Sequence, residues 1–148
     1  MAAVTEAEVV PGLVVHLDTD ELRHLGGSST NAEASNEQDR AVVGPHYFLI
    51  VEAAAGQCVA VPLFSRYAPG SELLQERLKA RLPDKWRGED SYFSRWQHWR
   101  TPISCVAAAS GTEESSTQER RAYAADNPDV LATIAGWQNR NRAPYRAL

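Results

Sequence analysis

Two apolar runs joined by a short Ala/Gly link constrain the fold of this chain more than any other feature. The runs are "HYFLIVEA" (46–53) and "QCVAVPLF" (57–64), and both are rich in the β-branched and aromatic residues that suit half-buried strands. The link at 54–56 ends in Gly, so the pattern predicts an antiparallel hairpin. Pro62 has no backbone N–H, so we expect it at a sheet edge or at a bulge near the end of its strand.

A further strand and a polar segment come before the hairpin. "GLVVHLD" (12–18) predicts a strand. The segment 19–40 is rich in Gly, Ser, Asn and acids, and it has little apolar side chain after Leu25. It cannot bury enough surface to offset its ordering entropy. We therefore predict a long mobile loop over 19–40, with at most a turn of helix at Asp20–Leu25.

The clearest helical pattern follows the hairpin. Ser71 is a suitable N-cap, leucines recur every four residues, and Pro83 is a stop signal, so the pattern predicts a helix over 71–82. "SYFSRWQHWR" (91–100) and "ISCVAAA" (103–109) predict a second strand pair with a break at Thr101–Pro102.

The last third of the chain predicts two helices and a loose end. A capping box from Ser116 to Glu119 predicts a helix over 115–127. Asn127 followed by Pro128 then marks the start of another. We expect the polar and basic tail, 140–148, to fray. Strands that pair locally and helices added to one side indicate a single α+β domain over 1–148, built on a small twisted barrel or half-barrel.

Composition narrows the class of protein. No run of 18 or more apolar residues exists, which argues against a membrane helix. The start, "MAAVTEAEVVPG", has no Lys or Arg, unlike a secretory signal, so we expect a cytoplasmic protein. Cys58 and Cys105 have no CxxC partner and are expected to be buried thiols. The four His show no ligand spacing, so no metal or other cofactor is predicted.

Charge is distributed unevenly along the chain. Residues 1–40 hold eight acids against Arg23 and Arg40, whereas residues 63–103 hold eight basic residues against five acids. The later part of the chain would attract an anionic partner. The alternative is an ordinary solvated basic face.

Several short motifs resemble those of the MazF/PemK/Kid toxin family. "PGLVVHLD" resembles the family's opening strand, "VAVPLFS" resembles its strand ending in Pro-Leu-Thr-Ser, and Pro45 with "HYFLIV" resembles its return after a long loop. "DSYFSRWQHWRTP" is similar in placement to a further segment of the family, matching at five positions: Ser91, Tyr92, Gln97, Arg100 and Thr101. The resemblance implies an SH3-like β-barrel with an inserted helix and C-terminal helices.

The resemblance also implies an activity, because family members cleave single-stranded RNA without a metal. An Arg beside the Pro and a hydroxyl after the Pro-Leu strand are implicated there. Here Gly44 stands in place of that Arg, and Phe64 in place of that Thr, with Ser65 one position later.

The chain therefore offers substitutes for the residues it lacks. RNA cleavage needs a group that activates the 2′-OH and a cation that stabilises the phosphate. On the family's pattern, Arg40 or Arg66 would steady the phosphate, and His46 or Ser65 would lie near the 2′-OH. The alternative for His46 is a strand-end histidine facing water.

Aromatic and basic residues interleave in the segment 85–100. This pattern is typical of single-strand binding, where rings stack on bases and Arg contacts phosphates. The simpler interpretation is that the large rings pack in the core with Arg stems beside them. The predicted nucleic-acid-binding residues are Arg66, Trp86, Arg87, Tyr92, Arg95, Trp96, Trp99 and Arg100.

Two functions follow as hypotheses. The first is a MazF/PemK-like protein that interacts with single-stranded RNA, with metal-independent endoribonuclease activity in the catalytic case. The second is a non-catalytic SH3-like module that binds a protein partner through its acidic loop. The resemblance further implies a homodimer and an antitoxin as partner.

Overall fold

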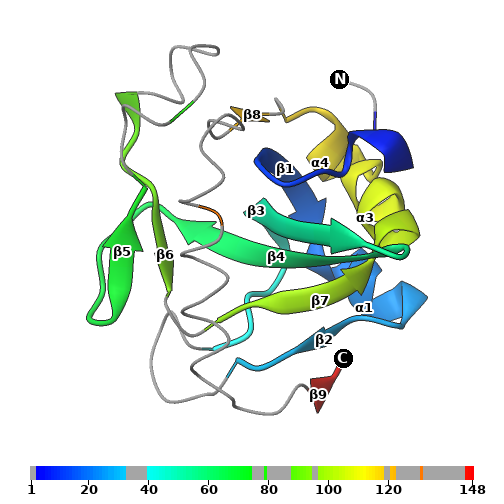
Figure 1. Cartoon of the computed structure of the whole chain (residues 1–148), viewed down its shortest axis with the longest axis horizontal. Coiled ribbons are helices and arrows are strands. Elements are labelled where there is room, and N and C mark those ends of the chain that lie inside the picture. The colour runs from blue at the N-terminus through cyan, green and yellow to red at the C-terminus, as the bar shows by residue number, and fades with distance from the viewer. Residues whose placement is uncertain are drawn as a thin grey trace.

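An antiparallel sheet forms the body of the molecule. The computed structural model describes residues 3–32, 40–74, 79, 88–94, 97–118, 121–122, 131 and 146–148. Within these residues the strands form a nine-stranded sheet in which every pair is antiparallel. Short helices accompany it, so the chain is α+β, as predicted (Figure 1).

Four longer strands make the centre of the sheet, and five shorter strands extend it. The path runs β8-β1-β3-β4-β7-β2-β9, and β6 pairs with both β4 and β5. The central strands are β1 (Leu13–Asp18), β3 (Pro45–Ala54), β4 (Gln57–Phe64) and β7 (Trp99–Pro102). The short strands are β2 (Ser29–Thr30), β5 (Ser71–Leu73), β6 (Tyr92–Ser94), β8 (Arg121–Ala122) and β9 (Arg146–Ala147).

The predicted hairpin is confirmed. Ala54 pairs with Gln57, which leaves Ala55 and Gly56 as a two-residue turn. Both have positive φ, 53° and 76°, the backbone conformation of the type I′ turn whose twist matches that of the flanking strands. Gly56 adopts this conformation at no steric cost.

Both faces of the central strands are buried, which explains why the two runs are almost continuously apolar. Phe48 and Ile50 contribute to one core, while Leu49 and Val51 contribute to the other. The first core includes Val15, Leu17, Phe48, Ile50, Cys58, Trp99 and Val106. The second includes Val14, Leu49, Val51, Val61, Leu63, Phe93 and Leu131.

Pro62 lies inside the sheet at a point where the neighbouring strand changes. It pairs with Phe48 of β3 on one side. On the other side, pairing of β4 with β7 ends at Ala60, and pairing with β6 begins at Leu63. The missing N–H of Pro62 therefore falls between two ladders. The bulge of this hairpin lies on β3, between Ile50 and Glu52.

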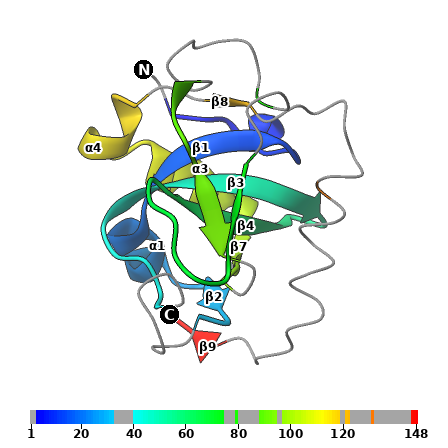
Figure 2. The same cartoon turned by 90° about the vertical axis from the view of Figure 1, so that its left-hand side faces the viewer.

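The helices gather on one side of the sheet. They are α1 (Thr19–Leu25), α3 (Ile103–Ser110) and α4 (Glu113–Ser116), with a short 3-10 turn, η1 (Glu6–Glu8). The β5–β6 pair lies at the opposite end of the molecule (Figure 1), and it comes to the front when the molecule is turned by 90° (Figure 2). No helix among the described residues is both long and apolar enough to span a bilayer.

The sheet does not close into the barrel that the resemblance implied. Among the described residues, β8 and β9 end the strand path and do not pair with each other. Barrel closure needs strands long enough to tilt and stagger around an axis. The two end strands have two residues each.

The prediction of a mobile loop over 19–40 is wrong where the structure describes that segment. Asp18 caps α1 through a hydrogen bond from the Asp20 N–H to its side chain (3.0 Å), so the predicted helical turn is confirmed. Polar side chains then tie β2 down: Thr30 Oγ1 donates to the His98 carbonyl (2.8 Å). The prediction considered only apolar burial as compensation for the entropy lost on ordering. In this segment hydrogen bonds provide that compensation. Residues 33–39 lie outside the described part.

The predicted helix over 71–82 is wrong at its start. Ser71–Leu73 is strand β5, paired with β6. The Ser71 hydroxyl donates to the Ala68 carbonyl (2.7 Å), and the Ala68 N–H donates to that hydroxyl (3.0 Å). Ser71 thus closes a turn at Ala68 instead of capping a helix. Lys79 lies in an isolated bridge, and the remaining positions of 75–82 are outside the described residues.

The predicted strand at 103–109 is instead helix α3. Val106, Ala109 and Ser110 are buried, at the spacing of one helical face. Three consecutive alanines have high helix propensity, which outweighs the β-branched start of the segment. The strand at 91–100 is confirmed in part, as β6 and β7.

The described residues cover the C-terminal predictions only in part. Ser116 is the last residue of α4, where its hydroxyl contacts the Glu113 carbonyl, and it is not an N-cap. Arg146–Ala147 forms strand β9 and pairs with β2, and the fraying of the tail stays a prediction. The helix predicted after Asn127 lies outside the described residues except for Leu131, which is helical and buried.

Candidate functional site

One end of the sheet gathers the predicted catalytic residues around the beginning of β3 and the end of β4. His46 of β3 meets Phe64 of β4 edge to face, with ring centroids 5.1 Å apart. Phe64 pairs with Tyr92 of β6, and Tyr92 makes an edge-to-face contact with Tyr67 (6.0 Å). Directly paired residues face the same side of a sheet. We call His46, Phe64, Tyr92 and Tyr67 the ring row.

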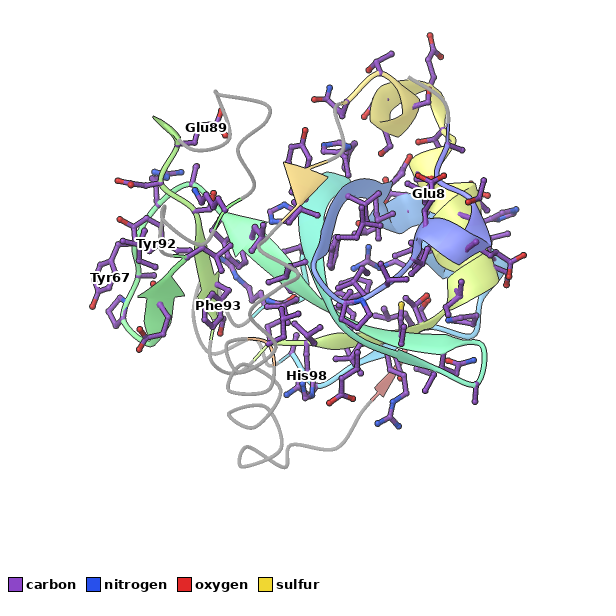
Figure 3. The ribbon with its side chains drawn as sticks, turned by 45° about the horizontal axis from the view of Figure 1, so that its top comes forward. Glu8, Tyr67, Glu89, Tyr92, Phe93 and His98 are labelled. Carbon is purple, nitrogen blue, oxygen red and sulfur yellow. The ribbon has the colours of Figure 1, made fainter. Side chains whose placement is uncertain are left out.

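The outer half of the ring row is open to solvent. Tyr67 is 67% exposed, and Leu73, which pairs with Tyr92, is also exposed. Tyr92 is half-buried. Figure 3 shows Tyr67 and Tyr92 beside each other at the β5–β6 pair, far from Glu8 of η1. Exposed rings at a strand end can stack on other planar groups.

The inner end of the ring row is a shielded histidine. Burial lowers the pKa of His46 from its usual value, a hydrogen bond with the Leu63 backbone raises it to a smaller extent, and the charge of His16 lowers it further. Nε2 of His46 is enclosed and has no hydrogen-bond partner among the described residues, so the bond to Leu63 uses Nδ1. A neutral ring held in this way presents a proton acceptor at Nε2. Buried polar atoms without partners are rare and often mark function.

The chain leaves β4 through the two other predicted residues of this end. Ser65 and Arg66 follow Phe64 directly, and both are exposed. The fold therefore brings Ser65 and Arg66 close to the ring row in sequence and in space. Acidic residues lie around the neighbouring strand pair: Glu72, Glu89 and Asp90.

Arg40 lies just before β3, in a segment held by other parts of the chain. Its side chain is exposed, and its carbonyl accepts a hydrogen bond from Nε2 of Gln97 (2.8 Å). The segment ends at Gly44, whose carbonyl accepts from the N–H (3.1 Å) and the hydroxyl (2.8 Å) of Thr19. Arg40 lies five residues before Pro45, which pairs with Asp18 at the end of β1, next to His46.

Of the remaining predicted nucleic-acid-binding residues, the two that the structure describes, Trp99 and Arg100, do not join this cluster. Trp99 is fully buried and packs against Phe48 (ring centroids 5.5 Å apart), as in the core-packing interpretation. Arg100 is exposed and pairs with Val59, a residue that packs against the second core, so it lies on the other face of the sheet from Trp99. Trp86, Arg87, Arg95 and Trp96 lie outside the described residues.

Sequence reasoning missed three residues of this end: Phe64, Tyr67 and Gln97. Phe64 was considered only as a departure from the toxin pattern, although a ring at a strand end next to "SRY" was a visible signal. Gln97 matched the toxin pattern, but nothing in the sequence pointed to its role, which depends on a contact with a segment 57 residues away.

A second pair of polar side chains lies on the opposite face of β1. Nδ1 of His16 is 2.9 Å from the hydroxyl of Ser115, and the His16 ring meets Tyr47 edge to face at 4.8 Å. Ser115 is buried. The contact anchors α4 to the sheet, and a buried hydroxyl offers a substrate no access.

Neither a search for groups of metal ligands nor the comparisons with known proteins adds a candidate function. No group of three or more His, Cys, Asp or Glu side chains among the described residues could hold a metal ion. No protein-family model matches the chain, and no curated protein or solved structure matches it either. The relationship to the MazF/PemK toxins stays a prediction.

Proposed function

We propose that this protein binds single-stranded RNA across the ring row, as a nucleic-acid-interacting protein of the MazF/PemK type with an open variant of the SH3-like sheet. The observation that carries the proposal is the ring row itself, with Ser65 and Arg66 exposed beside it. Base–aromatic stacking contributes about 1–3 kcal/mol per base, and it tolerates many sequences because every base has a π-face. Arg66 and Arg40 supply the cations for the phosphates.

The catalytic form of the proposal assigns His46 as general base for the 2′-OH. A lowered pKa keeps the ring neutral near pH 7, and Nε2 is the nitrogen left to accept a proton. Nε2 is enclosed, so cleavage requires a displacement that lets the ribose approach it. The Phe64 ring, which lies against His46, is the side chain placed to move. Ser65 and Arg40 then lie near the phosphate, in the roles of hydroxyl donor and cation.

One experiment tests this function with a matched control. Purified protein is incubated with mixed single-stranded RNA in EDTA, and products are resolved on a gel. The wild type is expected to cleave, and His46→Gln to lose about 100-fold or more in rate. His24→Gln, at an exposed histidine of α1, is expected to match the wild type. Full-length RNA with every variant would reject the catalytic form, and absence of RNA binding would reject the function itself.

The acidic residues around β5 and β6 favour a second candidate. Glu72 lies in β5 beside the exposed Leu73, and Glu89 and Asp90 come shortly before β6; such a mixture suits a protein segment with basic and apolar side chains. In this case the surface is an interaction module whose partner is a cationic peptide, as an antitoxin segment would be. Binding to RNA that weakens steeply with salt argues for the first candidate.

A further inference from the structure

The segment 40–44 has an unusual kind of support. Side chains and the start of α1 hold its backbone, in place of a neighbouring strand. Nη2 of Arg23 donates to the Val42 carbonyl (2.8 Å), and Thr19 donates to the Gly44 carbonyl. Arg23 itself is fixed by the Thr19 hydroxyl (3.1 Å) and lies over the Trp99 ring, 5.4 Å from its centroid.

Gln97 provides the support at the Arg40 end. Its Nε2 donates to the Arg40 carbonyl (2.8 Å), and its Oε1 accepts from the Val42 N–H (3.2 Å) and from Nε1 of Trp99 (2.9 Å). The side chain is fully buried, 0% exposed. Its own N–H donates to the Ser94 hydroxyl at the end of β6 (3.3 Å). The side-chain amide of Gln97 therefore connects the segment to the core, and its backbone N–H connects it to β6, the strand that carries Tyr92.

The contacts of Gln97 use both functions of the amide. The two donors at Oε1 would be satisfied equally by a carboxylate, but the Arg40 carbonyl needs an N–H. A residue needed only for packing would not require this division of donor and acceptor. The bond to the Arg40 carbonyl fixes the backbone from which the exposed guanidinium reaches.

We propose that Gln97 is a positioning residue, which holds Arg40 at the end of the sheet where His46 and the rest of the ring row lie. This inference rests on the proposed RNA function and names the residue that sets the place of one phosphate contact. Without the amide, Arg40 keeps its charge but loses its fixed place, so its contact with phosphate is lost. Gln97 does not touch RNA.

The test compares salt dependence in four proteins. The affinity for a labelled single-stranded RNA of about 16 nucleotides is measured by fluorescence anisotropy over a range of NaCl concentrations. The proteins are the wild type, Arg40→Ala, Gln97→Met and the double variant. Losing one phosphate contact is expected to reduce the slope of log K against log salt by about 0.7. We expect Arg40→Ala and Gln97→Met to show this same reduction, and the double variant to show no further loss.

Two further variants separate positioning from folding. Gln97→Glu keeps acceptors for Val42 and Trp99, replaces the donor to Arg40 by an oxygen and adds a negative charge, so it is read against the same charge change at Gln57 and is the second variant if Gln97→Met unfolds. Gln57→Met and Gln57→Glu make the same changes at an exposed glutamine of β4 and are expected to keep the wild-type slope.

The outcomes are distinguishable. A folded Gln97 variant with the wild-type slope, or losses that add in the double variant, would overturn the inference and leave RNA binding standing. A wild type that does not bind RNA would overturn the proposed function together with the inference.

Discussion

The imidazole of His46 lies edge to face against the ring of Phe64, with centroids 5.1 Å apart across the β3–β4 hairpin. This contact links a shielded proton acceptor to a row of rings that becomes more exposed toward Tyr67. The register of the β3–β4 hairpin therefore places the histidine beside the rings at this end of the sheet. The predictions below test the fold, the histidine and the surface separately.

Stability should fall in mild acid because of His46. Its pKa is lowered in the folded protein, so below about pH 6.5 the unfolded chain takes up a proton more readily than the native one. The neutral His46 ring contributes its full share to the free energy of unfolding above that pH. This share is lost as the pH falls toward the pKa of His46 in the folded protein. Urea unfolding of the wild type and His46→Gln measures it. The variant should lose less stability than the wild type between about pH 7.5 and about pH 5.5, and equal losses would contradict the assignment.

Gln97→Met should destabilise the fold. The change leaves the Val42 N–H and Nε1 of Trp99 without their acceptor, at a cost of about 1–3 kcal/mol each. Gln57→Met, at an exposed position, is the control and should change the free energy of unfolding by less than about 0.5 kcal/mol. Similar values for the two variants in urea titrations would show that the amide contacts contribute little.

Ala55→Asn should stabilise the hairpin. Ala55 has φ of 53°, where a side chain other than Asn, Asp or Gly is strained, and Asn-Gly is the preferred pair for this turn. We expect a gain of about 0.5–1 kcal/mol, read as a higher melting temperature. Since Ala54 pairs with Gln57 around this turn, a loss of stability would mean that the turn geometry is different.

The two cysteines should differ in reactivity. Burial raises the pKa of the Cys58 thiol to about 12, with a smaller contribution from the charge of Cys105. Its thiolate is therefore scarce near neutral pH. Cys105 is only half-buried, and its thiol contacts the Gly26 carbonyl at 3.7 Å. A thiol reagent should label Cys105 first and Cys58 only on unfolding, whereas labelling at equal rates would contradict the burial of Cys58.

The sequence predicts the centre of this fold well and its periphery poorly. The hairpin was predictable because its turn and both strands are local in sequence and apolar on both faces. The segment 19–32 was misjudged, because Ser28, Thr30 and Asn31 are buried through hydrogen bonds to β7 and the residue before it. Polar composition does not reveal such distant partners.

The candidate site shows the same division. His46 lies near the start of β3, and Ser65 directly follows the end of β4. Both are at the open end of the hairpin, so their proximity follows from a register that the sequence predicts. The addition of Tyr92 depends on β6 pairing with β4 across almost thirty residues, which no local pattern specifies. Helical periodicity at 71–82 even pointed away from β5, because a turn at Ala68 and pairing with β6 outweigh intrinsic preference.

The most direct test of the account is the affinity of Tyr92→Ala for single-stranded RNA. Anisotropy titrations compare it with the wild type and with Leu25→Ala, which removes an exposed apolar side chain from α1. If bases stack on the ring row, Tyr92→Ala should bind about 5- to 100-fold more weakly, and Leu25→Ala should match the wild type. Equal affinity of all three proteins for RNA, or no binding by the wild type, would contradict the proposed surface.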